Sequence, residues 1–483
     1  MDATSLLEGL AQGTTTSARL LDEHIARMEA RNTSLNAIVA TNLEAARARA
    51  AEADAARAEG TLWGPLHGLP MTIKDSFEVV GMPATSGAKA LAHHVPDQNA
   101  DAVERLIRAG AIVYGKTNLP VYAGEWQSFN PVYGVTSNPW DISRTPGGSS
   151  GGGAASVAAD FSPLELGSDV GGSIRIPAHF CGVFGHKPTH GLIPLRGHIP
   201  GPPGSLSEPD LAVAGPLARS ARDLALMLDI LVGPATTETA WHLDLPAPKA
   251  RALGEFRVGL WTSDPACPLE SDVLSVLEPA LDQLTDAGMQ GKRGAPAELD
   301  LATISKLYVK QLAPLMATGL PDRVFNRLGT MRQVLKVTSL FRAPPSPLLP
   351  IYLEGAIQPH RSWLRLKEFR AKLQARMARW FETYDVLLTP VAPWAAFPHA
   401  HDGNVITRTI QVPSGQRPYV DHLYWIGLAT ALGLPATSVP VGRTDDGLPV
   451  SVQVIGPRFG DHTCLAFAAE VERVLGGFVA PPA

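Results

Sequence analysis

The sequence predicts an α/β protein that folds as a single domain over residues 1–483. Short apolar runs alternate with helical patterns from about residue 64 to about residue 232, the order expected when helices cover a sheet. Hydrophobic residues make up 45% of the chain and charged residues 18%, so a large core can form and disorder is disfavoured. No internal repeat divides the chain, which favours one domain with insertions over two domains.

Residues 1–60 are expected to form a helical arm within this domain. Apolar residues recur at helical spacing from Leu20 to Met28, and Ser17 stands where it can cap that helix. Residues 43–59 are rich in Ala, Glu and Arg and stop at a glycine, as helices commonly do. The pattern is typical of a packing and solubilising arm.

The remaining elements are predicted from short apolar runs, which indicate strands, and from apolar residues at helical spacing, which indicate helices. Strands are expected at residues 71–73, 111–114, 255–262, 385–390, 436–441 and 450–455. Helices are expected at residues 103–109, 271–287 and 362–384, and from a capping Asp461 to the glycine pair at 476–477. The last two strands flank a turn signal at Asp445–Gly447, so we expect them to pair.

Charge and cysteine usage narrow the class of protein. The formal net charge is −5 and the chain has no basic stripe, which argues against nucleic acid and anionic membranes as main partners. The three scattered cysteines, Cys181, Cys267 and Cys464, indicate a reducing compartment, with neither a disulfide framework nor a metal site. Without a signal-peptide pattern or a run of about 18–20 apolar residues, a cytoplasmic protein with no integral membrane segment is expected. A homodimer is left open.

Two glycine clusters that contain serine lie near the middle of the chain. They are Gly147–Gly153 and Gly171–Ser173, with Ser149 and Ser173 24 residues apart. Glycine permits positive φ and close backbone approach, so each cluster can turn several N–H groups toward one point. A tetrahedral oxyanion requires such fixed donors. A flexible linker is disfavoured because apolar residues surround the second cluster, whereas linkers are polar throughout.

A serine nucleophile needs a base, and lysine is the candidate. The nearby histidines show no supporting Asp or Glu pattern; they are His67, His179, His186 and His190. Lys74 ends a strand that is apolar enough to be buried, and burial lowers the pKa of an ammonium group. A solvated strand-end lysine paired with Asp75 is the alternative interpretation.

A different nucleophile can be read from the first cluster. Gly148–Gly152 fits the G-x-S-x-G pattern of the nucleophile elbow, with Ser150 as nucleophile. That motif requires a strand directly before it, but residues 143–147 are turn-like. It would also leave Lys74 and Ser173 without a role, so we disfavour it.

Several blocks along the chain resemble the amidase signature family of serine hydrolases. GGSSGG (147–152) is followed by GSDVGGSIRIPAHFCGVFGHKPT (167–189). The other matching blocks are GLPMTIKD (68–75), GKTN (115–118), SNPWD (137–141), GLIPLRG (191–197), AGPLARSARDL (214–224), YDVLLTP (384–390), LPATSVPVG (434–442) and GLPVSVQVIGP (447–457). The resemblance covers nearly the whole chain and implies a large twisted mixed sheet flanked by helices on both faces.

The resemblance also implies the catalytic groups. Lys74, Ser149 and Ser173 take the places of a Ser–cisSer–Lys triad, with Ser173 as nucleophile and a cis peptide bond next to Ser149. Ser150 is expected to support the loop by hydrogen bonding within it. No cofactor and no metal is expected in this chemistry.

Two further roles are implied by the same resemblance. Asp169 and Arg175 are expected to hold the two glycine clusters together by charge-assisted hydrogen bonds. The oxyanion hole is expected from the backbone N–H groups of four residues, which are Val170, Gly171, Gly172 and Ser173.

The substrate is expected to be a small molecule with an amide bond. Residues 119–134 (LPVYAGEWQSFNPVYG) lack the acidic, MDEF-like stretch of the catalytic chain of glutamine-dependent amidotransferases. The chain is therefore expected to resemble more closely the branch that hydrolyses lipid amides and aryl acylamides. By position this segment should line the pocket through Tyr122, Ala123, Trp126 and Phe129, although each aromatic could instead belong to the core.

A divergent segment at residues 305–362 is expected to form either an amphipathic helical cap over the site or a face that docks a partner, and the cap, with an apolar entrance, is preferred. The predicted function is hydrolysis of an apolar or aryl amide, with carbamates and esters accessible to the same triad. The alternative is the catalytic subunit of an amidotransferase that needs a protein partner.

Overall fold

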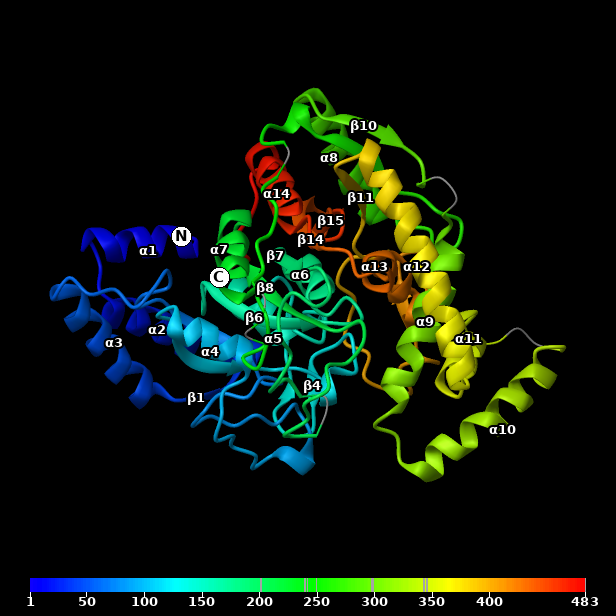
Figure 1. The fold of residues 1–483 in the computed structure, drawn as a ribbon, viewed down its shortest axis with the longest axis horizontal. Coiled ribbons are helices and arrows are strands. Elements are labelled where there is room, and N and C mark those ends of the chain that lie inside the picture. The colour runs from blue at the N-terminus through cyan, green and yellow to red at the C-terminus, as the bar shows by residue number, and fades with distance from the viewer. Residues whose placement is uncertain are drawn as a thin grey trace.

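One mixed sheet runs through the molecule. The computed structural model describes residues 1–199, 202–238, 240, 242–248, 250–296, 299–341, 344 and 346–482. Eleven strands lie in this sheet, and strands from both ends of the chain meet in it (Figure 1). In spatial order they are β1 (Ile38–Thr41), β3 (Ile112–Thr117), β2 (Pro70–Lys74), β6 (Leu164–Asp169), β8 (Val213–Ala218), β7 (Phe184–Lys187), β14 (Ala436–Arg443), β15 (Pro449–Ile455), β11 (Val386–Pro390), β9 (Arg257–Leu260) and β10 (Gln290–Arg293).

The pairing within the sheet alternates between parallel and antiparallel. Strand β2 runs parallel to both of its neighbours, β3 and β6. From β6 to β11 every neighbouring pair is antiparallel, and β11, β9 and β10 are parallel again. The two strands around the Asp445–Gly447 turn pair as predicted, with Ala436 opposite Ile455. Two small hairpins stand apart, β4 (Phe129–Asn130) with β5 (Gly134–Val135), and β12 (Thr409–Val412) with β13 (Gly415–Pro418).

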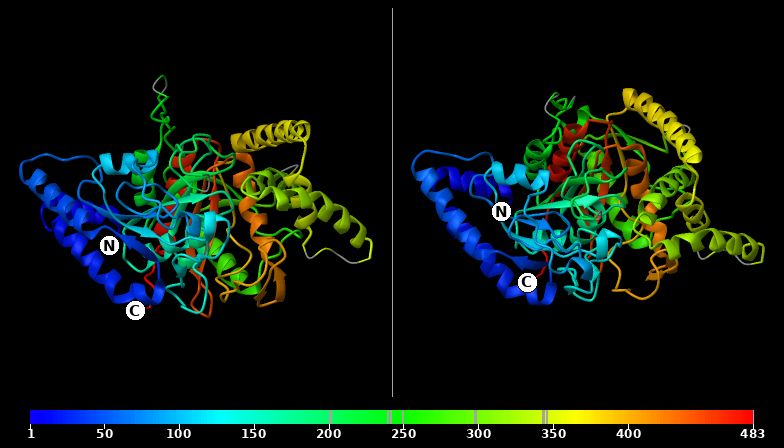
Figure 2. Two further views of the ribbon diagram at one scale, coloured as in Figure 1. Left: turned by 90° about the horizontal axis from the view of Figure 1, so that it is seen from below. Right: turned by 60° about the horizontal axis from the view of Figure 1, so that its bottom comes forward.

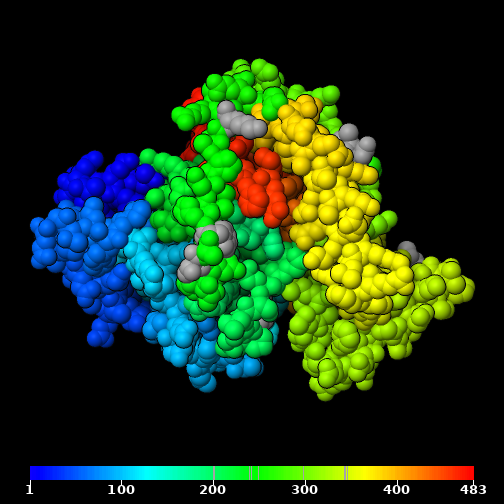
Figure 3. All heavy atoms as spheres, viewed as in Figure 1, coloured from blue at the N-terminus to red at the C-terminus, as the bar shows by residue number. Residues whose placement is uncertain are grey.

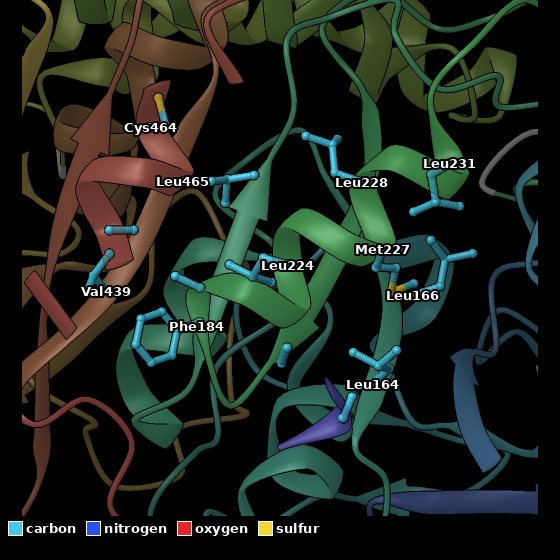
Figure 4. Packing of buried hydrophobic residues seen from close by; sticks show 14 of the residues in the cluster. Leu164, Leu166, Phe184, Leu224, Met227, Leu228, Leu231, Val439, Cys464 and Leu465 are labelled. Carbon is cyan, nitrogen blue, oxygen red and sulfur yellow. The ribbon is translucent and has the colours of Figure 1, made fainter. Parts of the chain in front are cut away.

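Helices cover both faces of the sheet, which confirms the predicted fold class. One apolar cluster joins sheet residues to helices α1 (Ala3–Gln12), α4 (Asp101–Arg108), α7 (Ala221–Leu231), α8 (Ser271–Asp286) and α14 (Asp461–Leu475). A second cluster joins sheet residues to α2 (Ser17–Leu35), α3 (Leu43–Ala58), α5 (Gly151–Ala158) and α6 (Arg175–Cys181). Figure 4 shows Leu224 and Leu228 of α7 over Leu164 and Phe184 of the sheet.

A third group of helices lies at one side of the sheet. It comprises α9 (Leu301–Ala317), α10 (Asp322–Thr338), α11 (Leu348–Ala356), α12 (His360–Thr383) and α13 (Leu423–Leu432). In Figure 3 the yellow of α12 lies along this side, and the two views of Figure 2 show α10 extending away from the body. The predicted 305–362 segment is therefore helical in its described parts, and its role as a cap stays a prediction.

Two expected caps are corrected by the structure. Thr16, not Ser17, caps α2, because the Thr16 hydroxyl accepts a hydrogen bond from the Arg19 amide over 3.1 Å. Asp461 is the first residue of α14, not its cap, and its carboxylate accepts from the Thr189 hydroxyl over 2.7 Å. It also lies 3.1 Å from His186 Nε2, so this histidine has an acidic partner that the sequence did not indicate.

Strands β2 and β6 position the site. Every residue of both strands is buried, because each strand has neighbours on both sides and helices on both faces. The two strands are parallel, so their carboxyl ends, Lys74 and Asp169, lie at the same edge of the sheet. The residues that follow β6 therefore form a loop beside the end of β2. That strands from residue 38 to residue 455 share one sheet supports the proposed single domain.

Candidate active site

Lys74 is fully buried and faces three serines. Its Nζ atom donates to Ser149 Oγ over 2.7 Å, to Ser150 Oγ over 2.9 Å and to Ser168 Oγ over 3.0 Å. Burial lowers the pKa of the Lys74 ammonium from 10.5 to about 7, although the nearby carboxylates Asp169 and Glu165 act in the opposite direction. At neutral pH a large fraction of this lysine is the free amine, which can accept a proton.

Asp75 does not pair with Lys74. Its carboxylate lies 3.4 Å from Nζ of another buried lysine, Lys116, and accepts a hydrogen bond from the Thr85 hydroxyl. The alternative interpretation of Lys74 as a solvated lysine paired with its neighbour is therefore wrong.

The first glycine cluster turns sharply in front of Lys74. The peptide bond between Gly148 and Ser149 is cis. A side chain at Gly148 would place a Cβ atom 2.7 Å from the Glu125 carbonyl oxygen, so the chain can pass this point only with glycine. The segment before it contains no strand, and α5 begins directly after Ser150. The strand–turn–helix context of a nucleophile elbow is thus absent at Ser150.

Ser150 connects the two glycine clusters. Its backbone N–H donates to the Ser173 carbonyl over 3.1 Å, and its hydroxyl donates to the Ser168 carbonyl over 3.3 Å. It also accepts from Lys74. Ser150 therefore bonds outside its own loop, whereas hydrogen bonds within the loop were expected.

The second glycine cluster forms a loop of closely spaced amides. Gly172 has a positive φ of 86°, and Asp169 Oδ1 accepts its N–H over 2.9 Å. Gly172 was expected to be an oxyanion donor, but its amide already donates to Asp169 and is therefore not free for the substrate. Within the described residues, no protein group accepts the amides of Val170, Gly171 and Ser173.

The ion pair of Asp169 and Arg175 lies beside this loop, and it does not bond to the first glycine cluster as expected. Arg175 donates to Asp169 over 2.8 Å, and neither side chain is exposed. Arg175 also donates to Thr430 Oγ1 over 2.8 Å and to Gln453 Oε1 over 2.7 Å. The pair therefore anchors the second glycine cluster to α13 and β15, and Ser150, not this pair, connects that cluster to the first.

Two side chains from distant segments hold the carbonyl groups of the second cluster. Trp126 Nε1 donates to the Gly171 oxygen over 2.7 Å, and the Tyr308 hydroxyl of α9 donates to the Val170 oxygen over 2.5 Å. Trp126 was among the pocket residues expected from the sequence. Tyr308 lies in the divergent segment at residues 305–362, and nothing in its sequence spacing points to this loop.

The other three expected pocket residues have different surroundings, and their place in the pocket stays a prediction. Tyr122 is 42% exposed and Ala123 follows it, both with positive φ, in the short turn Val121–Ala123. The Phe129 ring stacks on His401 at 4.1 Å between centroids. In the described part of the chain, no hydrogen bond or ring contact joins these three residues to the second glycine cluster.

An aromatic cluster surrounds Trp126 instead. Its ring contacts Tyr419 at 5.1 Å and His422 at 5.3 Å, and Trp394 and Phe397 also contact His422. These rings belong to one apolar cluster with Ile426 of α13. A Cβ atom built at Gly172 would lie 3.1 Å from Ile426, so this apolar cluster adjoins the loop.

Two residues that the sequence did not suggest complete the polar network. Ser168 accepts from Lys74, and His198 Nε2 lies 2.9 Å from Ser168 Oγ. Ser168 precedes Asp169 in β6, so its position beside the glycine cluster was the only available signal. His198 lies in the loop after β7, where it forms an isolated β-bridge with Phe77. It directly follows the GLIPLRG block (191–197), but the resemblance implied no role for it.

The structure also bears on metal binding, on disulfide bonds and on membrane-spanning helices. Over the described ranges, no group of three or more His, Cys, Asp or Glu side chains is arranged to hold a metal ion. All three cysteines are buried free thiols. Among the helices that the structure describes, none combines the length and the apolar character needed to cross a membrane.

Comparison with known proteins places the chain in a family. The family model described as Amidase matches residues 19–465. The A-type subunit of glutamyl-tRNA(Gln) amidotransferase from Synechococcus sp. (strain CC9605) is 32% identical, over 98% of this chain and 96% of that protein. Two solved structures are also similar. One, from a vestigial protein complex linked to the origins of an s-triazine catabolic enzyme, has a TM-score of 0.80 and 27% identity with full coverage of both chains. The other, a bacterial aryl acylamidase, has a TM-score of 0.79 and 25% identity over 98% of this chain and 96% of that one.

These comparisons correct the expected branch. The amidotransferase relatives share 31–33% of their sequence with this chain, above the 25% of the aryl acylamidase. The acidic stretch that this chain lacks is one short segment, whereas the sequence identity is measured over nearly the whole chain. One segment was therefore too little evidence to assign the branch. The matched length, the shared fold and the arrangement at Lys74 all agree, and the chain therefore belongs to the amidase family.

Proposed function

We propose that this chain is a stand-alone hydrolase of small non-peptide amides that carry an apolar or aromatic group. The observation that carries the proposal is the buried Lys74 within 2.7 Å of Ser149, in a loop hydrogen-bonded to Ser173. A base, a relay hydroxyl and a serine beside free backbone amides are the parts that amide hydrolysis through an acyl-enzyme requires.

The reaction proceeds in two halves. Neutral Lys74 accepts the proton of Ser149, and Ser149 accepts that of Ser173 as the Ser173 oxygen bonds to the carbonyl carbon. The negative charge on the former carbonyl oxygen is stabilised by the amides of Val170, Gly171 and Ser173. The C–N bond then breaks, and the amine leaves with the proton returned through Ser149.

Water completes the second half. It loses a proton through Ser149 to Lys74 and attacks the ester that joins the acyl group to Ser173. The Ser173 oxygen leaves, recovers its proton by the same route, and a carboxylic acid is released. No step needs a metal ion or an organic cofactor.

The aromatic surroundings support an apolar or aryl substrate. Trp126 lies on the second glycine cluster and packs against Tyr419 and His422. Glu125, next to Trp126, forms an ion pair with Arg408 at 2.8 Å, so its charge is neutralised within the protein. Flat apolar groups suit such walls, whereas a free amino acid needs charges left open to it. A carbamate or an ester presents the same carbonyl to Ser173.

A second function is favoured by the sequence relatives. Because the amidotransferase relatives share about a third of their residues with this chain over nearly full length, the chain could work as a catalytic subunit that releases ammonia from glutamine beside a protein partner. In either case we propose a cytoplasmic protein, with a homodimer as one oligomeric state to test.

A substrate panel with the purified chain separates the two functions. The panel contains an anilide, an aliphatic amide, an aryl carbamate and glutamine. We expect hydrolysis of the anilide without any partner and its loss in Ser173→Ala. Mass spectrometry of quenched wild type should show the acyl group on Ser173.

Ser156→Ala is a matched control, because this buried serine lies in α5 and its hydroxyl makes no hydrogen bond to Lys74 or to any other described residue. It should retain anilide hydrolysis. Activity on glutamine alone, or none until a partner is added, would replace the first proposal by the second. Retained activity in Ser173→Ala would refute both.

A further inference from the structure

His198 lies at the end of a hydrogen-bond chain that starts at the relay serine. The chain runs from Ser149 to Lys74 over 2.7 Å, from Lys74 to Ser168 over 3.0 Å, and from Ser168 to His198 Nε2 over 2.9 Å. Ser168 is the one hydrogen-bond partner of the His198 ring within the described residues. The ring therefore reaches the two glycine clusters only through Ser168 and Lys74, and it is not needed as a base.

The surroundings keep this imidazole uncharged. The Phe77 ring lies 4.6 Å from it, and burial together with the nearby Lys74 lowers the pKa of His198 to about 3. Asp169 and Glu165 are the other charged groups that act on Lys74, and both raise its pKa. His198 is therefore a fixed neutral group near neutral pH, in which one nitrogen carries a proton and the other is a bare acceptor. Within the described residues only Nε2 has a hydrogen-bond partner, and Nδ1 is buried without one.

The Ser168 hydroxyl can be oriented in two ways. In the first, a Lys74 N–H donates to Ser168, and the Ser168 O–H donates to His198 Nε2. In the second, His198 Nε2–H donates to Ser168, and the Ser168 O–H occupies the lone pair of neutral Lys74. Neutral Lys74 has a single lone pair, so only the first orientation leaves it free for the Ser149 proton.

We infer that His198 is a positioning residue that accepts the Ser168 hydroxyl proton and so keeps the Lys74 lone pair directed at Ser149. The inference rests on the proposed function of Lys74 as base. It requires the His198 tautomer with the proton on Nδ1. The Ser168 hydroxyl has two side-chain partners in the described residues, Lys74 and His198, so His198 is the partner that can accept its proton without occupying the Lys74 lone pair.

Two substitutions separate this role from simple packing. His198→Phe keeps a ring against Phe77 and removes the acceptor, and His198→Gln places an amide oxygen near the position of Nε2. In His198→Phe the Ser168 hydroxyl turns to Lys74, which stabilises the free amine and also occupies its lone pair. We expect kcat/KM to fall about tenfold, the effect of one misdirected hydrogen bond, with the midpoint of its pH profile moved to lower pH. His198→Gln should restore both the rate and the midpoint.

The pH profile is decisive. A midpoint that stays at the wild-type value or moves to higher pH in His198→Phe overturns the inference whatever the rate, because a packing defect that admits water would raise the pKa of Lys74 and not lower it. Failure of His198→Gln to restore the midpoint overturns it as well. The same profiles are measured with a fluorophosphonate probe that labels Ser173, so that the outcome does not depend on which amide is the substrate.

A measurement on the wild type tests the tautomer without any activity. In ¹⁵N-histidine NMR, the His198 signal is assigned by its loss in His198→Gln. We expect a neutral ring with the proton on Nδ1 from pH 5 to pH 9. A proton on Nε2, or an imidazolium near neutral pH, would overturn the inference. Absence of hydrolysis and of probe labelling in wild type would instead refute the proposed function. The NMR result would still decide the inference about the His198 tautomer.

Discussion

The Nζ atom of Lys74 lies 2.7 Å from the hydroxyl oxygen of Ser149, and neither side chain has appreciable contact with solvent. Water cannot compete for this contact, so a proton that leaves Ser149 has the lysine as its acceptor. The same exclusion of water lowers the pKa of the ammonium to about 7. Burial therefore produces both the geometry and the basicity that the proposed reaction needs.

The activity should depend on pH through Lys74. Protonated Lys74 cannot act as a base, so kcat/KM should fall tenfold for each unit of pH below about 7 and level off above it. Lys74→Ala should lose about 10²–10⁴-fold in amide hydrolysis, the usual contribution of general acid–base catalysis. Steady-state kinetics from pH 5 to pH 9 measure both.

The leaving group provides a control for that prediction. An amine leaves poorly without a proton, whereas an activated ester does not need one, so Lys74→Ala should affect anilide more than p-nitrophenyl ester hydrolysis. Equal losses on the two substrates, with no pH dependence, would contradict the role of Lys74 as base and acid.

The buried amine should also be visible in the stability of the protein. Lys74 has a folded pKa of about 7 and an unfolded pKa near 10.5, so between these values the unfolded chain binds more protons. The contribution of Lys74 to the free energy of unfolding is lowest below pH 7 and rises as the pH approaches 10.5. The free energy of unfolding of Lys74→Met, relative to that of wild type, should therefore be highest below pH 7 and should fall toward pH 10. Chemical denaturation at several pH values measures this difference, and a constant difference would refute the lowered pKa.

The carbonyl groups behind the proposed oxyanion donors should matter for the rate. Trp126→Phe removes the 2.7 Å hydrogen bond to the Gly171 oxygen, and Tyr308→Phe removes the one to the Val170 oxygen. Each change leaves a carbonyl of this loop without its partner, so the loop that carries the amides of Val170, Gly171 and Ser173 can shift away from the substrate. We expect about a tenfold loss in kcat with little change in KM for each variant. Phe129→Leu, on the ring stacked with His401, is the control and should leave kcat unchanged.

The ion pair beside the loop should be essential for folding. Asp169→Asn leaves the Arg175 guanidinium in a fully buried position without its counter-charge. Loss of one partner of a buried pair costs about 3–5 kcal/mol in the free energy of unfolding. Arg222→Lys, at an exposed pair with Asp2, is the matched control and should cost less than about 1 kcal/mol. Urea denaturation compares the two, and equal small losses would contradict the anchoring role of Arg175.

Patterns along the chain were sufficient for the local elements, and together with the family resemblance they indicated the candidate serines. The apolar run before Lys74 predicted a buried strand, and β2 is that strand. The 24-residue spacing of two glycine clusters singled out Ser149 and Ser173. These features are local, because a strand or a glycine turn is determined largely by its own residues.

The sequence by itself determined the α/β class, the buried lysine and the two serine loops of this protein. Only the tertiary structure decided what surrounds them: that Asp75 pairs with Lys116, that Arg175 reaches α13, and that Ser168 and His198 extend the network from Lys74. Those partners lie tens to hundreds of residues apart along the chain, and a hydrogen bond leaves no periodicity in either segment. The contact of Lys74 with Ser168 follows from the parallel alignment of β2 with β6, and that of Asp75 with Lys116 from the pairing of β2 with β3. The contacts of Arg175 and His198 depend on segments that the chain brings back to these strand ends.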